Sequence, residues 1–222
     1  MAGLRIKKTQ AREFSTTAVA SEPAYLWAYL PQQRQRRSEL GALFLLTGPP
    51  RSGKTTVANE VAKRLRARGV RVGGMTTSEV AQGGVRSGFQ VTDISSGRTG
   101  VLAQVSGEPG PRIGKYVVNQ ADLNEVGVKA IESAEENADL IIIDEVGPME
   151  LTSQAFVKAV EAALSSTKPV ILTLHWKASH PLLDRIRKEA RGSLLTVSPE
   201  NRATLASKIE QMICETNLPR KE

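Results

Sequence analysis

The sequence predicts a three-layer α/β/α sandwich, in which helices cover both faces of a mostly parallel β-sheet. Two observations carry this prediction. From residue 42 onward, short apolar runs alternate with amphipathic helical patterns, which is typical of parallel strands joined by crossover helices. Near residues 80–105, β-rich runs follow one another without a helix and predict a β-hairpin insertion. A composition of 40% hydrophobic and 24% charged residues fits a globular protein.

The first predicted elements surround a glycine-containing loop. The apolar run ALFLLT at 42–47 predicts a strand covered on both faces. Apolar residues at four-residue spacing from 57 to 65 then predict an amphipathic helix, which Gly69 can end. The run VRVGGMTT at 70–77 predicts a second strand. At 83–105, the turn signal SSGR between two β-rich runs predicts the hairpin.

The second half continues the alternation. Asp122 with Glu125 three residues later resembles a capping box and predicts a helix start. The run ADLIIID at 138–144 is the most apolar predicted strand. Ser153 is placed to cap the next helix, and KPVILTL at 168–174 predicts the strand after it. The closing elements are a helix beginning at Pro181, the strand SLLTV at 193–197 and a helix through Leu205, Ile209 and Met212.

Composition divides the chain into a basic N-terminal extension at 1–40 and one domain at 41–222. The extension carries seven Lys or Arg residues against three Asp or Glu residues, more than half of the net charge of +7. We expect a solvated, partly disordered tail, with nucleic-acid binding or an organelle transit peptide as alternatives.

Cysteine content and hydropathy exclude other classes. The single cysteine, Cys214, excludes an internal disulfide framework and fits a reducing compartment. No apolar run reaches the roughly 18 residues that suggest a membrane span. We therefore expect a cytoplasmic protein with no membrane partner, and favour a monomer.

The loop between the first strand and the first helix predicts phosphate binding. Residues 48–55 read GPPRSGKT, which fits the phosphate-loop motif G-x-x-x-x-G-K-[ST] in its required strand–loop–helix context. Amides at a helix start lack internal partners and lie at the positive end of the dipole, so they bind anions. Lys54 would reach the β- and γ-phosphates, the Thr55 hydroxyl would join a Mg²⁺ shell, and Thr56 would help hold the α-phosphate. The predicted nucleotide-binding residues of the loop are Gly48, Pro49, Pro50, Arg51, Ser52, Gly53, Lys54, Thr55 and Thr56.

The run LIIIDEVG predicts the acidic half of the same site. Asp144 ends a buried strand, at the sheet edge where doubly wound sheets bind ligands. It can hold Mg²⁺ directly or through water, with Thr55 as the other predicted metal ligand. Glu145 is placed to orient or deprotonate an attacking water and, with Lys54, is the predicted catalytic pair. Helix capping or ion pairing is the alternative for Glu145, and Gly147 completes the predicted nucleotide site.

These motifs together resemble the THEP1-type nucleoside-triphosphatases over about residues 43–214. The resemblance rests on TGPPRSGKTT and VSPENRATL, and most specifically on GGMTTSEVAQGGVRSGFQVTDISSGRTGVLA and DEVGPMEL. It implies a P-loop α/β fold and slow, Mg²⁺-dependent hydrolysis of ATP, GTP, CTP and UTP with broad base tolerance. Arg51 and Ser52 depart from the glycine and small apolar residue that many members carry. The extension at 1–40 is a second departure, about which the family resemblance says nothing.

Two other functions remain open from the sequence. Small P-loop kinases share the loop and the sheet, so a nucleoside or nucleotide kinase is one alternative. An NTP-dependent nucleic-acid-associated factor is the other, because the extension is basic. Four residues have alternative roles: Arg51, Arg86 and Lys115 are either phosphate-neutralising or solvated charges, and His175 is either near the γ-phosphate or structural.

Overall fold

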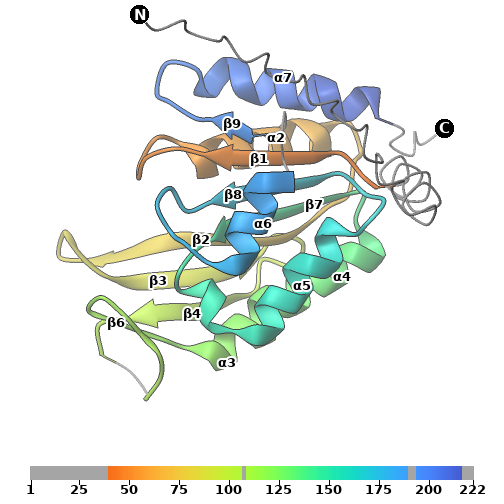
Figure 1. The fold of residues 1–222 in the computed structure, drawn as a ribbon. Coiled ribbons are helices and arrows are strands. Elements are labelled where there is room, and N and C mark those ends of the chain that lie inside the picture. The colour runs from red at the N-terminus through yellow and green to blue at the C-terminus, as the bar shows by residue number, and fades with distance from the viewer. Residues whose placement is uncertain (1–39, 107–108, 190–193, 217–222) are drawn as a thin grey trace, which may run out of the picture. The chain divides into compact units, whose positions relative to one another are not determined.

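A single mixed β-sheet runs through the part of the chain that the computed structural model describes, residues 40–106, 109–189 and 194–216. The predicted extension at 1–40 lies, except for residue 40, outside this part. The strand order is β5-β6-β4-β3-β2-β7-β8-β1-β9 (Figure 1). The strands are β1 (Leu43–Thr47), β2 (Val72–Gln82), β3 (Val85–Asp93), β4 (Thr99–Gln104), β5 (Arg112–Ile113), β6 (Tyr116–Val118), β7 (Leu140–Val146), β8 (Val170–Leu174) and β9 (Leu194–Thr196).

Helices connect the parallel part of this sheet. They are α2 (Lys54–Ala67), α3 (Gln120–Asp122), the π-helical turn η1 (Leu123–Val128), α4 (Lys129–Asn137), the 3₁₀ turn η2 (Glu150–Thr152), α5 (Gln154–Leu164), α6 (Pro181–Glu189) and α7 (Arg202–Glu215). None of the helices in the described ranges is long and apolar enough to cross a membrane. Cys214 on α7 is a half-buried free thiol.

The predicted three-layer sandwich is confirmed. Strands β2, β7, β8, β1 and β9 pair in parallel. Alternate residues of β7 face opposite layers, as the strand period of two requires: Ile141 and Ile143 pack with α4, α5 and α6, whereas Leu140 and Ile142 pack with α2 and α7. Because both faces are covered, β7 and β8 are apolar without alternation, which is why these runs were readable from the sequence.

The insertion is larger than the predicted hairpin. The chain continues β2 past the parallel core to Gln82, turns at Gly83 and Gly84, and then forms β3, β4, β5 and β6, all antiparallel to their neighbours. The hairpin expected at the SSGR signal is the β3–β4 turn. The other strands were missed because β5 and β6 are only two and three residues long, too short for a periodic signal. This antiparallel extension, β3 to β6, lies at one side of the sheet (Figure 1).

Local capping signals were correct in three places and wrong in one. Gly69 follows α2 with φ of 82°, the Ser153 hydroxyl accepts the Phe156 amide at 3.2 Å to cap α5, and Pro181 begins α6. Asp122, however, is not the cap of its helix: the Asn119 side chain accepts the Asp122 amide at 3.0 Å. The Asp122 carboxylate instead accepts the Val101 amide of β4 at 2.7 Å, a long-range bond that no local pattern encodes.

The turn after β7 is stabilised by a buried acid. Glu150 is 5% exposed, and its Oε2 accepts the backbone amide of Gly147 at 3.1 Å. Burial and the neighbouring negative charge of Glu145 together raise the pKa of Glu150 to about 8, against the opposing effect of backbone hydrogen bonds. The carboxyl group is therefore mostly protonated at neutral pH.

Substitution of Gly74 tests how closely β2 and β7 pack. It has φ of 108°, and a Cβ on it would lie 2.0 Å from the carbonyl oxygen of Ile142. Gly69 is the matched control, with φ of 82° and open space around a Cβ. Gly69→Ala should cost about 1–2 kcal/mol of unfolding free energy through its left-handed backbone alone. Gly74→Ala should cost clearly more in urea unfolding, because a strand must also shift; equal costs would contradict this packing.

Burial of Glu150 predicts a pH dependence of stability. With a pKa of about 8 when folded against 4.5 as the ordinary value, this carboxyl keeps a proton between those limits that the unfolded chain has released. Its contribution to stability is therefore fully present below about pH 4.5 and is lost as pH rises toward 8. Glu150→Gln should remove that loss and flatten unfolding midpoints measured from pH 5 to 9.

The exposed Glu132 on α4 provides the control for this substitution. Glu132→Gln should keep the pH dependence of the parent chain. A parent-like slope in Glu150→Gln would show that Glu150 is not the group responsible.

Candidate active site

The loop between β1 and α2 is shaped to bind an anion. Gly48 and Gly53 have φ of 148° and 102°, and Arg51 between them has φ of 64°, a left-handed conformation unusual for a residue with a side chain. Among the residues that the structure describes, no side chain caps the start of α2. Its first amides therefore have no helical acceptor, and they lie at the positive end of the helix dipole.

Lys54 lies over this loop. Its side chain is largely buried, and Nζ donates to the carbonyl oxygens of Gly48 at 3.2 Å and Pro49 at 3.5 Å. The same ammonium group is 4.0 Å from Oε2 of Glu145. The structure thus brings the two predicted catalytic residues together, although they are 91 positions apart in the chain.

Ser52 adds an unpartnered polar group to the loop. The residue is 5% exposed, and its Oγ has no hydrogen-bond partner in the described part of the chain. This oxygen lies against the backbone of Gly48, where a Cβ would be only 2.8 Å away. A buried hydroxyl without a partner is costly, so a loop ligand that accepts its hydrogen bond would stabilise the site. These features fit a phosphate.

Asp144 joins the loop to the sheet. It is 1% exposed, and its carboxylate accepts three hydroxyl hydrogen bonds: from Thr55 at 3.2 Å, Thr76 at 3.1 Å and Thr173 at 2.5 Å. The three donors stand on α2, β2 and β8. Burial raises the pKa of Asp144, while the three hydroxyl hydrogen bonds and the Lys54 charge oppose that rise.

The donor chemistry beside Asp144 fits a magnesium ion. Thr55 Oγ1 and Asp144 Oδ1, the two predicted metal ligands, are 3.2 Å apart, and both are hard oxygen donors of the kind that Mg²⁺ binds next to phosphates. Thr76 and Thr173 were not predicted from the sequence. The β2–β7 register pairs Thr76 with Asp144, but the register between two strands cannot be predicted from the sequence of one strand alone.

Glu145 occupies a different environment from its neighbour. Its side chain is 26% exposed. Burial raises the pKa of Glu145 to about 7, the Lys54 charge opposes this rise, and the Asp144 charge adds to it. A carboxyl group with a pKa near neutrality can exchange a proton with a reacting group at working pH.

Gly147 is a spacer in this acidic turn. A Cβ on it would lie 3.1 Å from Oε2 of Glu150, 3.3 Å from Oε1 of Glu145 and 3.6 Å from Cβ of His175. Its missing side chain therefore lets two carboxyl groups and an imidazole approach one another. Glu150, which the sequence reasoning did not single out, is a second buried carboxyl group of the motif DEVGPMEL, beside Asp144.

Two hollows open beside Lys54 and Glu145. The first, called the loop pocket, has a volume of about 740 Å³. Its lining residues are Pro50, Arg51, Gly53, Lys54, Thr55, Thr56, Thr77, Ser78, Glu79, Arg86, Phe89, Glu145 and Arg202. The second, called the apolar pocket, has about 340 Å³. Its lining residues are Pro50, Lys54, Thr77, Arg86, Phe89, Leu102, Ile113, Glu145, Gly147, Pro148, Met149, Glu150, His175 and Trp176.

The residues with alternative roles have different positions. Arg86 lines both pockets; it donates to the Tyr116 hydroxyl at 3.0 Å and pairs with Glu79. Arg51 is exposed and lines the loop pocket. Lys115 lines neither pocket, and its Nζ lies 5.4 Å from the Tyr116 ring.

His175 lines the apolar pocket with a partly structural role. Its Nδ1 accepts the amides of Lys177 at 3.3 Å and Ala178 at 3.0 Å. Burial lowers the pKa of His175, and the positive charges of Lys54 and Arg187 lower it further. The imidazole is therefore neutral at pH 7, and because Nδ1 accepts, the proton stands on Nε2.

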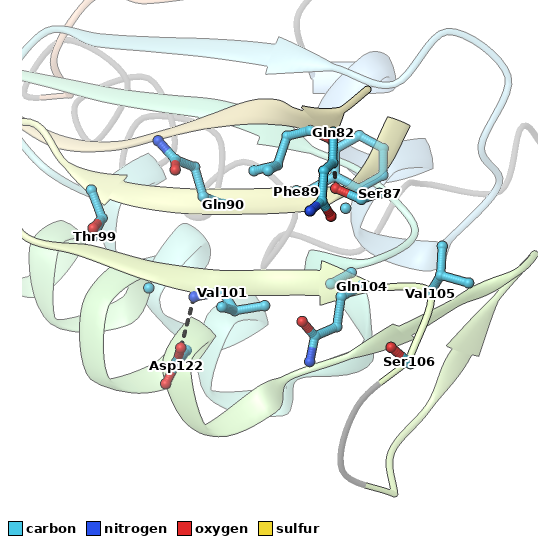
Figure 2. A pocket seen from close by; sticks show the side chains of 14 residues that line it. Gln82, Ser87, Phe89, Gln90, Thr99, Val101, Gln104, Val105, Ser106 and Asp122 are labelled. Atoms are coloured by element: carbon cyan, nitrogen blue, oxygen red, sulfur yellow. Dashed lines mark hydrogen bonds between the residues drawn. The ribbon is translucent and has the colours of Figure 1, made fainter. Parts of the chain in front are cut away.

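Another hollow lies on the antiparallel extension and carries little chemistry. It has a volume of about 600 Å³ and is lined by residues of β3, β4 and their neighbours. Figure 2 shows Gln82, Gln90 and Gln104 around it, with the hydrogen bond from the Val101 amide to Asp122. Asp122 is the one ionisable residue among its described lining residues and is already bonded.

Comparison with known proteins identifies relatives along most of the chain. A family model described as NTPase matches residues 43–210. The nucleoside-triphosphatase THEP1 of Thermofilum pendens is 47% identical over 171 residues, which cover 77% of this chain and 94% of that protein. The nucleoside-triphosphatase THEP1 of Methanosarcina acetivorans is 46% identical over 165 residues, which cover 74% of this chain and 92% of that protein.

Two solved structures share the fold. THEP1 from the hyperthermophile Aquifex aeolicus matches with a TM-score of 0.68 and 29% identity, over 77% of this chain and 98% of that one. A human cancer-related nucleoside triphosphatase matches with a TM-score of 0.64 and 34% identity, over 80% of this chain and all of that one. The family match spans the loop, Asp144 and Glu145, and this chain belongs to the NTPase family that includes the THEP1 nucleoside-triphosphatases.

Proposed function

We propose that this chain hydrolyses nucleoside triphosphates to the diphosphate and inorganic phosphate, with Mg²⁺ as cofactor. The observation that carries the proposal is the pairing of two contacts at one loop. Thr55 meets Asp144 at 3.2 Å, and Lys54 meets Glu145 at 4.0 Å. The first contact brings together two oxygen ligands for Mg²⁺. The second places the Lys54 ammonium group beside a carboxylate that can act on water.

The loop would bind the triphosphate through its backbone and two side chains. The free amides at the start of α2 and the Ser52 hydroxyl donate to phosphate oxygens. The Lys54 ammonium leaves the carbonyl groups of Gly48 and Pro49 for the β- and γ-phosphates, because a phosphate is a stronger acceptor for a charged donor. Mg²⁺, held by Thr55 and Asp144, would neutralise phosphate charge when bound.

Glu145 would place the attacking water and accept its proton. Because the pKa of Glu145 is about 7, a large share of its side chains are carboxylates at neutral pH. The same pKa keeps transfer of a proton from the attacking water to this carboxylate favourable. The new bond joins the water oxygen to the γ-phosphorus, the bond to the β-phosphate oxygen breaks, and the nucleoside diphosphate leaves. Lys54 and Arg86 stand where they can stabilise the charge that develops.

Broad base selection follows from the lining of the loop pocket. Most of the polar side chains beyond the phosphate loop are on exposed residues, among them Ser78, Glu79 and Arg202. Exposed groups are solvated without a base and lose little when one base replaces another, whereas buried polar groups discriminate strongly. We therefore expect ATP, GTP, CTP and UTP all to serve. Arg202, which the sequence reasoning missed, can stack on any of these bases.

We infer that residues 41–222 form the catalytic domain and that 1–40 are an added basic extension. The family match begins at residue 43, and the described residues belong to one compact unit. All the groups in the proposed mechanism lie within that unit.

Lys54→Ala tests the phosphate loop. Removing the ammonium group should weaken NTP binding and reduce turnover by at least about 10²-fold, as expected for the loss of a charge that stabilises the transition state. Lys63→Ala, on an exposed position of the same helix, should behave as the parent chain. Phosphate release with each of the four NTPs measures the effect, and turnover within a factor of two of the parent would remove Lys54 from the mechanism.

Glu145→Gln tests the general base separately from binding. The amide keeps the size of the side chain but cannot accept the proton, so kcat should fall by about 10²-fold or more while the affinity for Mg²⁺-NTP is kept. Single-turnover phosphate release and equilibrium binding of a fluorescent nucleotide separate the two quantities. A rate close to that of the parent chain would assign proton transfer to another group.

A further inference from the structure

The apolar pocket adjoins the loop pocket at Lys54 and Glu145. The two hollows share six lining residues: Pro50, Lys54, Thr77, Arg86, Phe89 and Glu145. Glu145, the residue proposed to act on the attacking oxygen, therefore faces both. A molecule in the apolar pocket would present its atoms to the same place as the attacking water.

The walls of this pocket are unlike those that water requires. Apolar side chains from five segments line it: Phe89 on β3, Leu102 on β4, Ile113 on β5, Pro148 and Met149 after β7, and Trp176 after β8. A single water needs polar partners and gains nothing from apolar walls. A hollow of about 340 Å³ with apolar walls and a few polar groups is instead typical of a small-molecule site, at the small end of the range.

The polar groups of the pocket favour an uncharged ligand. Glu150 is mostly protonated at pH 7, and the neutral His175 can donate from Nε2. Arg86 is already bonded to Tyr116 and paired with Glu79, and Lys54 serves the triphosphate. Among the described lining residues, two helical elements begin: α2, whose amides face the loop, and the three-residue 3₁₀ turn η2 at Glu150. Among the described lining residues, an anionic molecule that accepts the phosphoryl group would therefore find no cation without a partner.

We propose that the apolar pocket binds a second substrate, a small uncharged alcohol with an apolar or aromatic body, which competes with water for the γ-phosphoryl group. The proposal rests on the hydrolase function proposed above. The alcohol oxygen forms a bond to the γ-phosphorus, its proton passes to the carboxylate of Glu145, and the bond from the γ-phosphorus to the β-phosphate oxygen breaks. The products are a phosphate monoester and the nucleoside diphosphate, with no oxidant or further reactant.

Transfer to model alcohols tests this second substrate. The full chain with Mg²⁺ and γ-labelled ATP is given methanol, benzyl alcohol or 2-phenylethanol, and labelled ester and inorganic phosphate are separated and counted. Ester formation from the aromatic alcohols should saturate as the alcohol concentration rises. At equal molar concentration, each aromatic alcohol should give at least about tenfold more ester than methanol. Ester formation that is absent, or that is linear and equal for all three alcohols, would overturn the proposal.

Filling the pocket provides the matched variants. Ile113→Trp and Met149→Trp, at two half-buried positions of the lining, should each lower the ratio of ester to phosphate by at least about tenfold. Val85→Trp, on an exposed residue that does not line the pocket, should leave that ratio unchanged. If the two filling variants keep the parent ratio with the aromatic alcohols, the alcohol does not bind in this pocket and the proposal fails.

The two proposals fail in distinguishable ways. Phosphate release without ester would leave the hydrolase function intact and reject the second substrate. Absence of both products in the parent chain would reject the hydrolase function, and the second substrate with it.

Discussion

The buried carboxylate of Asp144 is the constraint on which the rest of the site depends. A carboxylate removed from water is costly unless its lone pairs are hydrogen-bonded, and here hydroxyl groups from α2, β2 and β8 satisfy them. Because the three donors come from segments far apart in the chain, one side chain fixes the end of β7 against both neighbouring strands and against the phosphate loop. The loop can therefore be preorganised before a nucleotide binds.

The position of Asp144 also explains why the next residue can have another role. The carboxylate oxygens of Asp144 accept hydrogen bonds inside the protein, whereas the side chain of Glu145 is partly exposed and lies beside Lys54. Two adjacent carboxyl groups thus have different partners and different exposure, which suits the separate roles of metal ligand and general base proposed for them. Gly147 keeps this arrangement open, since any side chain there would press against Glu145 and Glu150.

Local patterns predicted much of this structure. The loop between β1 and α2, the apolar strands β1, β7 and β8, and the carboxyl pair at the end of β7 each depend on contiguous residues, so the sequence was sufficient to predict their positions. Thr76 and Thr173 could not be predicted, because their role depends on which strands are neighbours and in what register. The same holds for Asp122, which was interpreted as a helix cap and is bonded to β4. Arg202 reaches the loop pocket from α7, a contact that only the fold creates.

The parallel core and the antiparallel extension have separable tasks. The groups that would hold the triphosphate and the metal, among them Lys54, Thr55 and Asp144, stand on the core elements that parallel sheets of this kind position at their carboxyl edge. Arg86, Phe89, Leu102 and Ile113, which close one side of the apolar pocket, all stand on β3 to β5. The extension can therefore change what lies beside the γ-phosphate without disturbing the three threonine bonds to Asp144. The antiparallel extension would then select the molecule that receives the phosphoryl group, and the parallel core would activate that molecule.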